Sequence, residues 1–410
     1  MEQFLQSAKK AKPIIATLSG EKRNNILHQM SEAILESALF IIRENMKDIE
    51  YGRTNNLSSS LMDRLLLNPS RIEDMANAIK EIASLKDPVG RILDGWVTEN
   101  ELSIEKVSVP IGVIGIIYES RPNVTSDTAA LCFKSGNVCI LKGGKEAEHS
   151  NKAIAQVLQQ VLIKNNLPES IISLLPDSSR EGVANLITQD AYVDLIVPRG
   201  GEALIQFVSR NSSVPVIKHD KGLCHTYIDK YANEEKAIKI VINAKCQRPG
   251  VCNALETLLV HKDLAPFILP KLYKELQANG TELFGCSETM KIINTKEATE
   301  EDYKTEYLAN ILTIKVVAST EEAIEHIEKY GSGHSEAILS ESYTEIQKFL
   351  NTVDSACVYA NASTRFTDGG AFGFGAEVGI STNKLHARGP MGINELTTYK
   401  FKILGNGQIR

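Results

Sequence analysis

Hydrophobic residues recur at helical spacing along the first hundred positions. In EKRNNILHQMSEAILESALFIIRENMKDIEYG (21–52), apolar side chains return every three or four residues with charges between them. This pattern predicts an amphipathic helical segment. A second such segment, RIEDMANAIKEIASLKDPVG (71–90), ends at Pro88 and Gly90, which cannot continue a helix without cost. The first hundred residues are therefore predicted to be mainly helical.

Beyond residue 100 the pattern changes to short apolar runs. The stretch ENELSIEKVSVPIGVIGIIYES is rich in β-branched residues and predicts an extended arm at 102–109 followed by a buried strand at 112–118. Strand-like NVCILK, SIISLLP and VDLIVP then alternate with helical NVTSDTAALCFKSG and SNKAIAQVLQQVLIKNNLP, the latter with Ser150 as its predicted N-cap. This alternation predicts a doubly wound parallel sheet over roughly Met1 to His219.

A second α/β unit is predicted from CHTYIDKYA onward. It contains CQRPGVCNALETLLV (246–260), a strand in LTIKVVAS (312–319), and helices at 265–280 and 320–333. The glycine-rich FTDGGAFGFGAEVGIS (366–381) is predicted to be a functional loop, because it has too few side chains to build a core. The segment GINELTTYKFKIL (392–404) is predicted to be extended.

Composition narrows the class of protein. The 410 residues are 43% hydrophobic and 23% charged, which suits a globular chain of two or three domains. No apolar run has membrane-spanning length, and the first thirty residues lack a signal peptide pattern. Seven scattered cysteines then predict reduced thiols and a cytoplasmic location. A net charge of −6 without a basic run disfavours nucleic-acid binding, and the eight histidines form no metal motif, so no metal site is predicted.

Two cysteines, Cys246 and Cys252, flank an Arg248-Pro249-Gly250 turn. Their spacing matches neither a C-x-x-C redox motif nor a zinc pair. If the apolar run 254–260 opens a helix, the positive helix end would favour a Cys252 thiolate, and the Cys252 N–H would be an oxyanion donor. Cys246 is predicted to pack within the preceding helix. These residues alone leave open whether Cys252 is catalytic or simply a small buried side chain.

Paired glycines follow several predicted strands. Gly112-x-x-Gly115 and Gly143-Gly144 do not form G-x-G-x-x-G, so tight turns are the favoured explanation for each pair taken singly. Gly200 and Gly201 stand between an apolar strand and an amphipathic helix, where bare backbone N–H groups can approach a phosphate. A plain turn remains the alternative there.

Taken in order, several segments resemble the aldehyde dehydrogenase superfamily, and most closely its acyl-phosphate-reducing branch. They are VPIGVIGIIYESRPNVT, CILKGGKEA, VPRGG, HDKGLCHTYID, CQRPGVCNALET, TEYLANILTIKVV and GGAFGFGAEVGISTNKLHARGPMGINELTTYK. The resemblance covers nearly the whole chain. It implies an α/β fold with a Rossmann-type NADP(H)-binding domain (1–100 and 113–225), a second α/β catalytic domain (226–390) and a β-strand oligomerisation flap (101–112 and 391–410).

The resemblance also implies roles for individual residues. Cys252 matches the nucleophile and Asn123 the amide of the oxyanion hole. Lys145 stands where relatives often carry a glutamate that holds the NAD ribose, and this favours NADPH, although Glu146 beside it keeps NADH open. The remaining implied cofactor-binding residues are Lys142, Gly200, Gly201 and Glu306. Substrate anions could be bound by Arg121, Arg248, Arg365 or Arg388, and surface ion pairs are the expected alternative for at least two of these four.

One departure from the wider superfamily informs the reaction. The stretch HDKGLCH has His219, or with a one-residue shift Asp220, where hydrolytic relatives carry a general-base glutamate. The resemblance thus implies NADPH-dependent reduction of L-glutamyl 5-phosphate to L-glutamate 5-semialdehyde through a Cys252 thioester, the second step of proline synthesis from glutamate. The alternatives are a CoA-acylating or simple NAD(P)-dependent aldehyde dehydrogenase, and a non-catalytic protein of the same fold. The implied partners are further copies of the chain and a separate glutamate 5-kinase.

Overall fold

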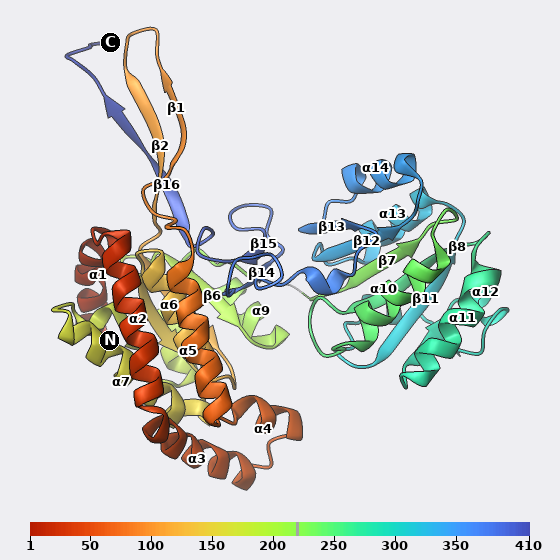
Figure 1. Cartoon of the computed structure of the whole chain (residues 1–410), viewed down its shortest axis with the longest axis horizontal. Helices are drawn as coiled ribbons and strands as arrows, with labels where there is room; N and C mark the ends of the chain where they lie inside the picture. Colours follow the sequence, from red (N-terminus) through yellow and green to blue (C-terminus); the bar gives the residue numbers. More distant parts are fainter. Residues whose placement is uncertain (219–220) are drawn as a thin grey trace. The chain divides into compact units, whose positions relative to one another are not determined.

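The computed structural model describes residues 1–218 and 221–410, and the chain divides into two compact units (Figure 1). The first comprises Met1–Lys218, Gly373–Gly379 and Met391–Arg410, and the second comprises His219–Phe372 and Ile380–Pro390. The domain boundary predicted at 225/226 falls inside strand β7 (Cys224–Ile228). Because β7 pairs along its length with strands of the second unit, the physical division lies earlier in the chain.

Five helices open the first unit. They are α1 (Glu2–Ala16), α2 (Gly20–Glu36), α3 (Ala38–Thr54), α4 (Ser59–Leu65) and α5 (Pro69–Ser84). The helical prediction for 21–52 is confirmed, but the segment breaks at Ser37, which separates α2 from α3. The Ser19 hydroxyl accepts the Lys22 N–H and caps α2, so the helix begins where the first orphan backbone donors find an acceptor.

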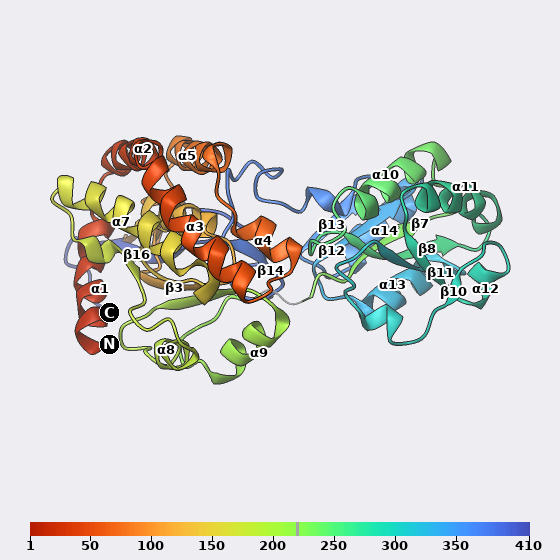
Figure 2. The same ribbon diagram turned by 90° about the horizontal axis from the view of Figure 1, so that it is seen from below.

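The sheet of the first unit is parallel and doubly wound, as predicted. Its strand order is β5 (Ile172–Leu174), β4 (Val138–Lys142), β3 (Val113–Tyr118), β6 (Leu195–Arg199). The later helices are α6 (Asn123–Lys134), α7 (Glu148–Lys164), α8 (Arg180–Leu186) and α9 (Glu202–Asn211). Figure 2 shows α2, α3 and α5 on one side of this sheet and α8 and α9 on the other. Strand β3 is buried on both faces, which explains its uninterrupted apolar sequence.

The start of α7 differs from the prediction. Ser150 is not the N-cap, because it lies inside the helix and is fully buried. The capping acceptor is the carboxylate of Asp48 on α3, which accepts the N–H groups of His149 (3.1 Å) and Ser150 (2.7 Å) and the Ser150 hydroxyl (2.5 Å). Burial raises the pKa of Asp48, and these hydrogen bonds oppose that shift. A cap supplied from a distant helix leaves no local sequence signal.

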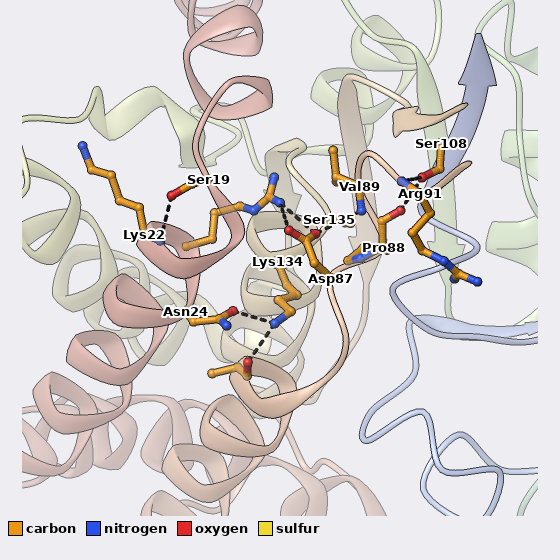
Figure 3. A network of polar contacts seen from close by, with 12 residues as sticks. Ser19, Lys22, Asn24, Asp87, Pro88, Val89, Arg91, Ser108, Lys134 and Ser135 are labelled. Atoms are coloured by element: carbon orange, nitrogen blue, oxygen red, sulfur yellow. Dashed lines mark hydrogen bonds and ion pairs between the residues drawn. The ribbon is translucent and has the colours of Figure 1, made fainter. Parts of the chain in front are cut away.

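The turn that stops α5 is fixed by a polar network (Figure 3). The buried Arg23 guanidinium of α2 bonds both oxygens of Asp87 at 2.8 and 2.7 Å. The Lys134 ammonium of α6 donates to the Ala83 carbonyl at 2.7 Å, and the Ser108 hydroxyl donates to the carbonyl of Pro88 at 2.6 Å. These bonds tie the end of α5 to three other elements, so the turn is rigid in spite of its loop sequence.

Three antiparallel strands form a ribbon that projects from the rest of the first unit (Figure 1). They are β1 (Ile92–Val97), β2 (Ser103–Pro110) and β16 (Thr397–Leu404), in the order β1-β2-β16. The predicted extended stretches 102–109 and 392–404 correspond to β2 and β16, whereas β1 was not predicted. The large apolar side chains that the ribbon exposes on β1 and β16 are those of Ile92, Leu93, Trp96, Val97, Tyr399, Phe401, Ile403 and Leu404.

The second unit is a parallel sheet between two helical layers. Its strands follow the order β10 (Lys296–Glu297), β9 (Glu282–Gly285), β11 (Ile311–Val317), β8 (Leu255–His261), β7, β12 (Ser335–Leu339), β13 (Cys357–Ala360). One apolar cluster joins the sheet to α10 (Glu234–Cys246) and α11 (Ala265–Ala278), and another joins it to α13 (Thr320–Tyr330) and α14 (Tyr343–Thr352). Leu258 and Leu259 enter opposite clusters, as strand alternation requires.

Three short elements complete the list. Helix α12 (Ser287–Met290) follows β9, and strands β14 (Gly379–Ser381) and β15 (Gly389–Met391) form a separate two-stranded sheet. Within the described ranges, no helix combines the length and the apolar character that crossing a bilayer requires.

Candidate functional site

Cys252 lies in a turn between α10 and β8, three residues before that strand. The prediction that a helix opens here is wrong, because the apolar run 254–260 forms the buried strand β8 (Leu255–His261). A short apolar run does not distinguish a buried strand from a helix. The positive end of a helix therefore cannot be what favours a Cys252 thiolate. Cys246 is the last residue of α10 and packs against an apolar cluster, as predicted.

The Cys252 carbonyl is held by two residues that precede β7 or open it. A Cβ atom on Gly222 would lie 1.9 Å from the Cys252 carbonyl oxygen, so the two backbones meet without room for a side chain. The Cys224 thiol donates to the same oxygen at 3.2 Å, and its sulfur lies 3.6 Å from Nδ1 of His334. Burial raises the pKa of Cys224, which keeps this thiol protonated and able to donate.

The opposite side of the turn is bonded to the short helix η4 (Thr364–Phe366). The Asn253 amide donates to the Thr367 carbonyl at 2.7 Å, and the Asn253 carbonyl accepts the Thr364 hydroxyl at 2.8 Å. The Arg365 guanidinium donates through Nη1 to Oδ1 of Asn253 and through Nε to Oε1 of Gln247 at 2.9 Å. Residues 247–253, here named the cysteine loop, are thus held at both ends.

Two of the predicted cationic residues lie near Cys252. Burial lowers the pKa of the half-buried Arg365, and the positive charge of Arg248 lowers it further, while Asp368 and Cys252 oppose the shift. Arg248, Arg365 and Cys252 are therefore close enough to interact electrostatically. Arg388 instead pairs with Asp354, whose Oδ1 lies 2.7 Å from its Nη2.

A buried ion pair beneath the cysteine loop has no counterpart in the sequence analysis. Lys245 of α10 and Glu256 of β8 are at most 1% exposed, with Nζ and Oε2 3.1 Å apart. Burial raises the pKa of Glu256, Lys245 opposes this shift, and the charge of Glu306 adds to it. Glu306 also acts on the thiol of Cys224. The predicted cofactor residue Glu306 therefore lies in the same region as the cysteine loop.

The remaining predicted residues belong to the first unit, at the carboxyl ends of its parallel strands. Lys142 ends β4, and Gly200 and Gly201 follow β6. Glu119, directly after β3, accepts the Gly201 N–H at 3.0 Å. Burial lowers the pKa of Lys142, and the charges of Glu146 and Glu119 oppose this. This edge of a doubly wound sheet is where such folds bind nucleotides.

Lys145 and Glu146, the two residues that bear on the choice between NADPH and NADH, differ in their contacts. Oε1 of Glu146 accepts the Ser120 N–H at 2.7 Å and the Ser120 hydroxyl at 2.5 Å. This carboxylate oxygen is therefore hydrogen-bonded within the protein, to the residue that lies just after β3. Lys145, in the short helix η1 (Lys145–Ala147), is exposed. Lys142 and Lys145 thus lie at this edge together with the carboxylates of Glu119 and Glu146.

Asn123 is the first residue of α6, and its amide donates to Oδ2 of Asp127 at 2.9 Å. Burial raises the pKa of Asp127 to about 6, against the hydrogen bonds from Asn123 and Ser126 and the charge of Arg199. The predicted substrate residue Arg121 lies just before α6, where its carbonyl accepts the Val124 N–H at 3.0 Å. The carboxylate at Asp127 thus fixes the orientation of the Asn123 side chain.

The predicted site residues are divided between the two units. The first brings Arg121, Asn123, Lys142, Lys145, Gly200 and Gly201 to its carboxyl edge, and the second brings Arg248, Cys252, Glu306 and Arg365 around the cysteine loop. His219 and Asp220, discussed as the missing base, lie outside the described residues. In the part of the chain that the structure describes, no group of three or more His, Cys, Asp or Glu side chains could hold a metal ion.

Residues that the sequence analysis missed are Gly222, Cys224, Lys245, Asn253 and Glu256. The first two lie in HDKGLCHTYID and the last two in CQRPGVCNALET, segments that carried the resemblance. Their presence in those segments was the available signal. Gly222 and Cys224 contact the Cys252 carbonyl, Lys245 pairs with Glu256, and Asn253 is bonded to the η4 segment. These contacts depend on how the elements pack in the fold, which spacing along the chain does not express.

Comparison with known proteins places these features in context. The aldehyde dehydrogenase family model matches residues 1–282. A gamma-glutamyl phosphate reductase of Aliarcobacter butzleri is 66% identical over 410 residues, with 100% of both chains covered. The solved gamma-glutamyl phosphate reductase of Thermotoga maritima is 46% identical, with a TM-score of 0.98 over 100% of this chain and 99% of that one. An engineered glycolyl-CoA reductase with bound NADP+ is similar in fold alone, at 15% identity and a TM-score of 0.68 over 98% of this chain and 96% of that one.

Proposed function

Because the chain belongs to the aldehyde dehydrogenase family, in its gamma-glutamyl phosphate reductase branch, we propose that it reduces L-glutamyl 5-phosphate to L-glutamate 5-semialdehyde and phosphate. This is the second step of proline synthesis from glutamate. The observation that carries the proposal is the 66% identity with the Aliarcobacter butzleri reductase over the full length of both chains.

Cys252 is the proposed nucleophile. Its thiolate attacks the acyl carbon, the bond from that carbon to the phosphate oxygen breaks, and a thioester remains on Sγ. The Asn123 amide is proposed as a donor to the oxyanion that forms during this attack, a contribution typically worth 10²–10³-fold in rate. After reduction, the carbon–sulfur bond of the hemithioacetal breaks, which releases the aldehyde and restores the thiolate.

NADPH is the proposed reductant, and the hydride that reduces the thioester is the chemistry it supplies. The residues proposed to hold it are Lys142, Lys145, Gly200, Gly201 and Glu306. Support comes from the two lysines at the carboxyl edge of the first sheet and from Glu146, whose Oε1 is bonded to Ser120. A cation suits the 2′-phosphate that distinguishes NADPH from NADH.

Arginines are the proposed partners of the substrate anions. Arg248 lies exposed on the cysteine loop. The Arg365 guanidinium has five N–H donors and uses two of them in hydrogen bonds to Gln247 and Asn253. Arg121 is the corresponding proposal in the first unit. Arg388 is a weaker candidate, because its guanidinium pairs with Asp354.

Phosphate dependence of the reverse reaction tests the proposed chemistry. Purified protein should oxidise L-glutamate 5-semialdehyde with NADP+ only when phosphate or arsenate is present. Equal rates without either anion would instead assign a simple aldehyde dehydrogenase, and a requirement for coenzyme A would assign an acylating one. No turnover with any acyl phosphate would favour a non-catalytic protein of this fold.

A homo-oligomer is also proposed, formed through the ribbon of β1, β2 and β16. Support comes from the eight large apolar side chains exposed on β1 and β16, because exposed strands with apolar side chains invite pairing with another chain. Association with a separate glutamate 5-kinase and a cytoplasmic location stay predictions from the sequence.

A further inference from the structure

We propose that Arg365 is a positioning residue for Cys252. Arg365 holds the cysteine loop in place, and its positive charge favours the thiolate of Cys252. The inference rests on the proposed function, in which Cys252 is the nucleophile. This role is separate from the proposed substrate contact of Arg365, because here the guanidinium acts through the loop and its charge.

The elements that flank Cys252 in the chain do not present a helix N-terminus to it. The loop follows the carboxyl end of α10, which ends at Cys246. That end of a helix carries partial negative charge. The segment after Cys252 is strand β8, which supplies no compensating helix N-terminus. Positive charge from a nearby side chain would favour a thiolate at this position.

The geometry of Arg365 connects it to both ends of the loop. Its Nε donates to Gln247, the first loop residue, and its Nη1 donates to Asn253, the residue after Cys252. The planar guanidinium presents these donors in a fixed fork, which a lysine cannot reproduce. The Asn253 amide also donates to the Thr367 carbonyl, two residues beyond Arg365. The guanidinium is therefore fixed relative to the Cys252 backbone.

Arg365 also interacts electrostatically with Cys252. Cys252 raises the pKa of Arg365, and because electrostatic interaction is mutual, Arg365 favours the charged form of Cys252 by the same energy. Among the described residues, the cations near the loop also include Arg248, which is exposed, and Lys245, which is paired with Glu256. The groups that act on Cys224 or Arg365, and so surround the loop, include the carboxylates of Glu256, Glu306, Glu336 and Asp368. Arg365 is the cation that also hydrogen-bonds the loop.

The test compares Arg365→Gln, Arg365→Lys and the control Lys239→Gln in the full chain without substrate. Lys239 lies on α10 and pairs with Glu235 in solvent, so its variant removes one positive charge from the same unit. Iodoacetamide alkylation of the Cys252 peptide is followed by mass spectrometry across pH. Arg365→Gln should raise the midpoint by on the order of one pH unit, because a neighbouring opposite charge shifts a pKa by about 1–3 units. Arg365→Lys should lie between the wild type and Arg365→Gln, and Lys239→Gln should match the wild type.

Kinetics separate positioning from substrate binding. The proposal expects kcat to fall in Arg365→Gln with KM changed less. An unchanged alkylation midpoint with a raised KM would assign Arg365 to the substrate and overturn the proposal. If Arg365→Gln does not fold, as judged by its unfolding transition, the Arg365→Lys midpoint decides: a wild-type value overturns the proposal. Failure of wild-type Cys252 to label first counts against the proposed function, yet an Arg365-dependent midpoint at Cys252 would still support the inference.

Discussion

The carbonyl oxygen of Cys252 lies 1.9 Å from the position that a Cβ atom of Gly222 would occupy. The two residues are thirty positions apart, and the absence of a side chain at Gly222 lets the chain before β7 support the cysteine loop directly. The Cys224 thiol, two residues later, bonds the same oxygen. The position of the proposed nucleophile therefore depends on Gly222, which has no side chain that could take part in the reaction.

Gly222→Ala should move the cysteine loop and lower kcat by about 10–100-fold, because a displacement near 1 Å at a reacting group has effects of this order. Overpacking should also cost about 1–3 kcal/mol of unfolding free energy. Steady-state kinetics and denaturant unfolding measure the two effects. Gly250→Ala is the matched comparison on the same loop, with its nearest atom at 3.4 Å, and should lose less. Equal kinetics for wild type and Gly222→Ala would contradict the support role.

Cys252→Ala should abolish reduction of the acyl phosphate while leaving NADPH binding, followed by nucleotide fluorescence, unchanged. Cys246→Ala is the control, because this thiol packs at the end of α10 and its polar contact is with the Thr281 hydroxyl at 3.5 Å. It should retain activity. In the wild type, alkylation at modest pH should label Cys252 first, and substrate should slow the labelling. First labelling of Cys246 would exchange the two roles.

Lys145→Ala should weaken NADPH binding by roughly 10–100-fold, since a hydrogen bond to a charged group contributes about 1.5–3 kcal/mol. NADH binding should change little, because NADH lacks the 2′-phosphate. Titration of both nucleotides by calorimetry measures the difference. Lys152→Ala removes a lysine of α7 that is paired with Glu148, and should leave both affinities unchanged. An equal loss for NADPH and NADH in Lys145→Ala would refute the proposed discrimination.

Asp127→Asn should stabilise the protein near neutral pH. Burial raises the pKa of Asp127 from 3.8 to about 6, so between these values the folded state binds more proton than the unfolded state. The stability contributed by this group is present below pH 3.8 and is lost as pH rises through 6. At pH 7 the variant should gain about 1–3 kcal/mol, discounted for partial exposure, and at pH 3.5 almost nothing. Urea unfolding across pH tests this, and a pH-independent difference would contradict it.

Trp96→Glu should weaken the proposed homo-oligomer. Trp96 of β1 contacts Phe401 of β16 edge-to-face, with ring centroids 6.1 Å apart, and both side chains are exposed. A carboxylate placed on this apolar surface would have to be desolvated on association. Analytical ultracentrifugation should show a smaller species at the same concentration. Tyr343→Glu, on the exposed face of α14, is the control that should keep the wild-type mass. An unchanged mass for Trp96→Glu would exclude this ribbon as the interface.

Much of the architecture was predictable because it depends on local patterns. The period of apolar residues predicted α2, α3 and α5, and the short β-branched runs predicted β3, β4 and β6. Where a strand and a helix share a pattern, prediction was wrong: the run after Cys252 is equally apolar in either conformation, and only its position between two helical layers makes it β8.

Local sequence also missed contacts that arrive from elsewhere in the chain. Ser150 has the chemistry of an N-cap, yet Asp48 performs that role from α3. Arg365 has the chemistry of a substrate ligand, and its guanidinium also bonds Gln247 and Asn253, which its sequence context did not indicate. Residue type limits which bonds a side chain can form, and the partners available in the folded chain decide which of them it does form.

By itself, the sequence determined the α/β class and the two units in outline, because periodicity is a local property. Its resemblance to the aldehyde dehydrogenase superfamily supplied the residues that are proposed to carry the chemistry. Only the tertiary structure decided how Cys252 is held. Gly222, Cys224 and Arg365 meet the cysteine loop from two separate segments. Their contacts arise from the packing of β7, β8 and η4, and such long-range contacts depend on the whole fold and not on spacing along the chain.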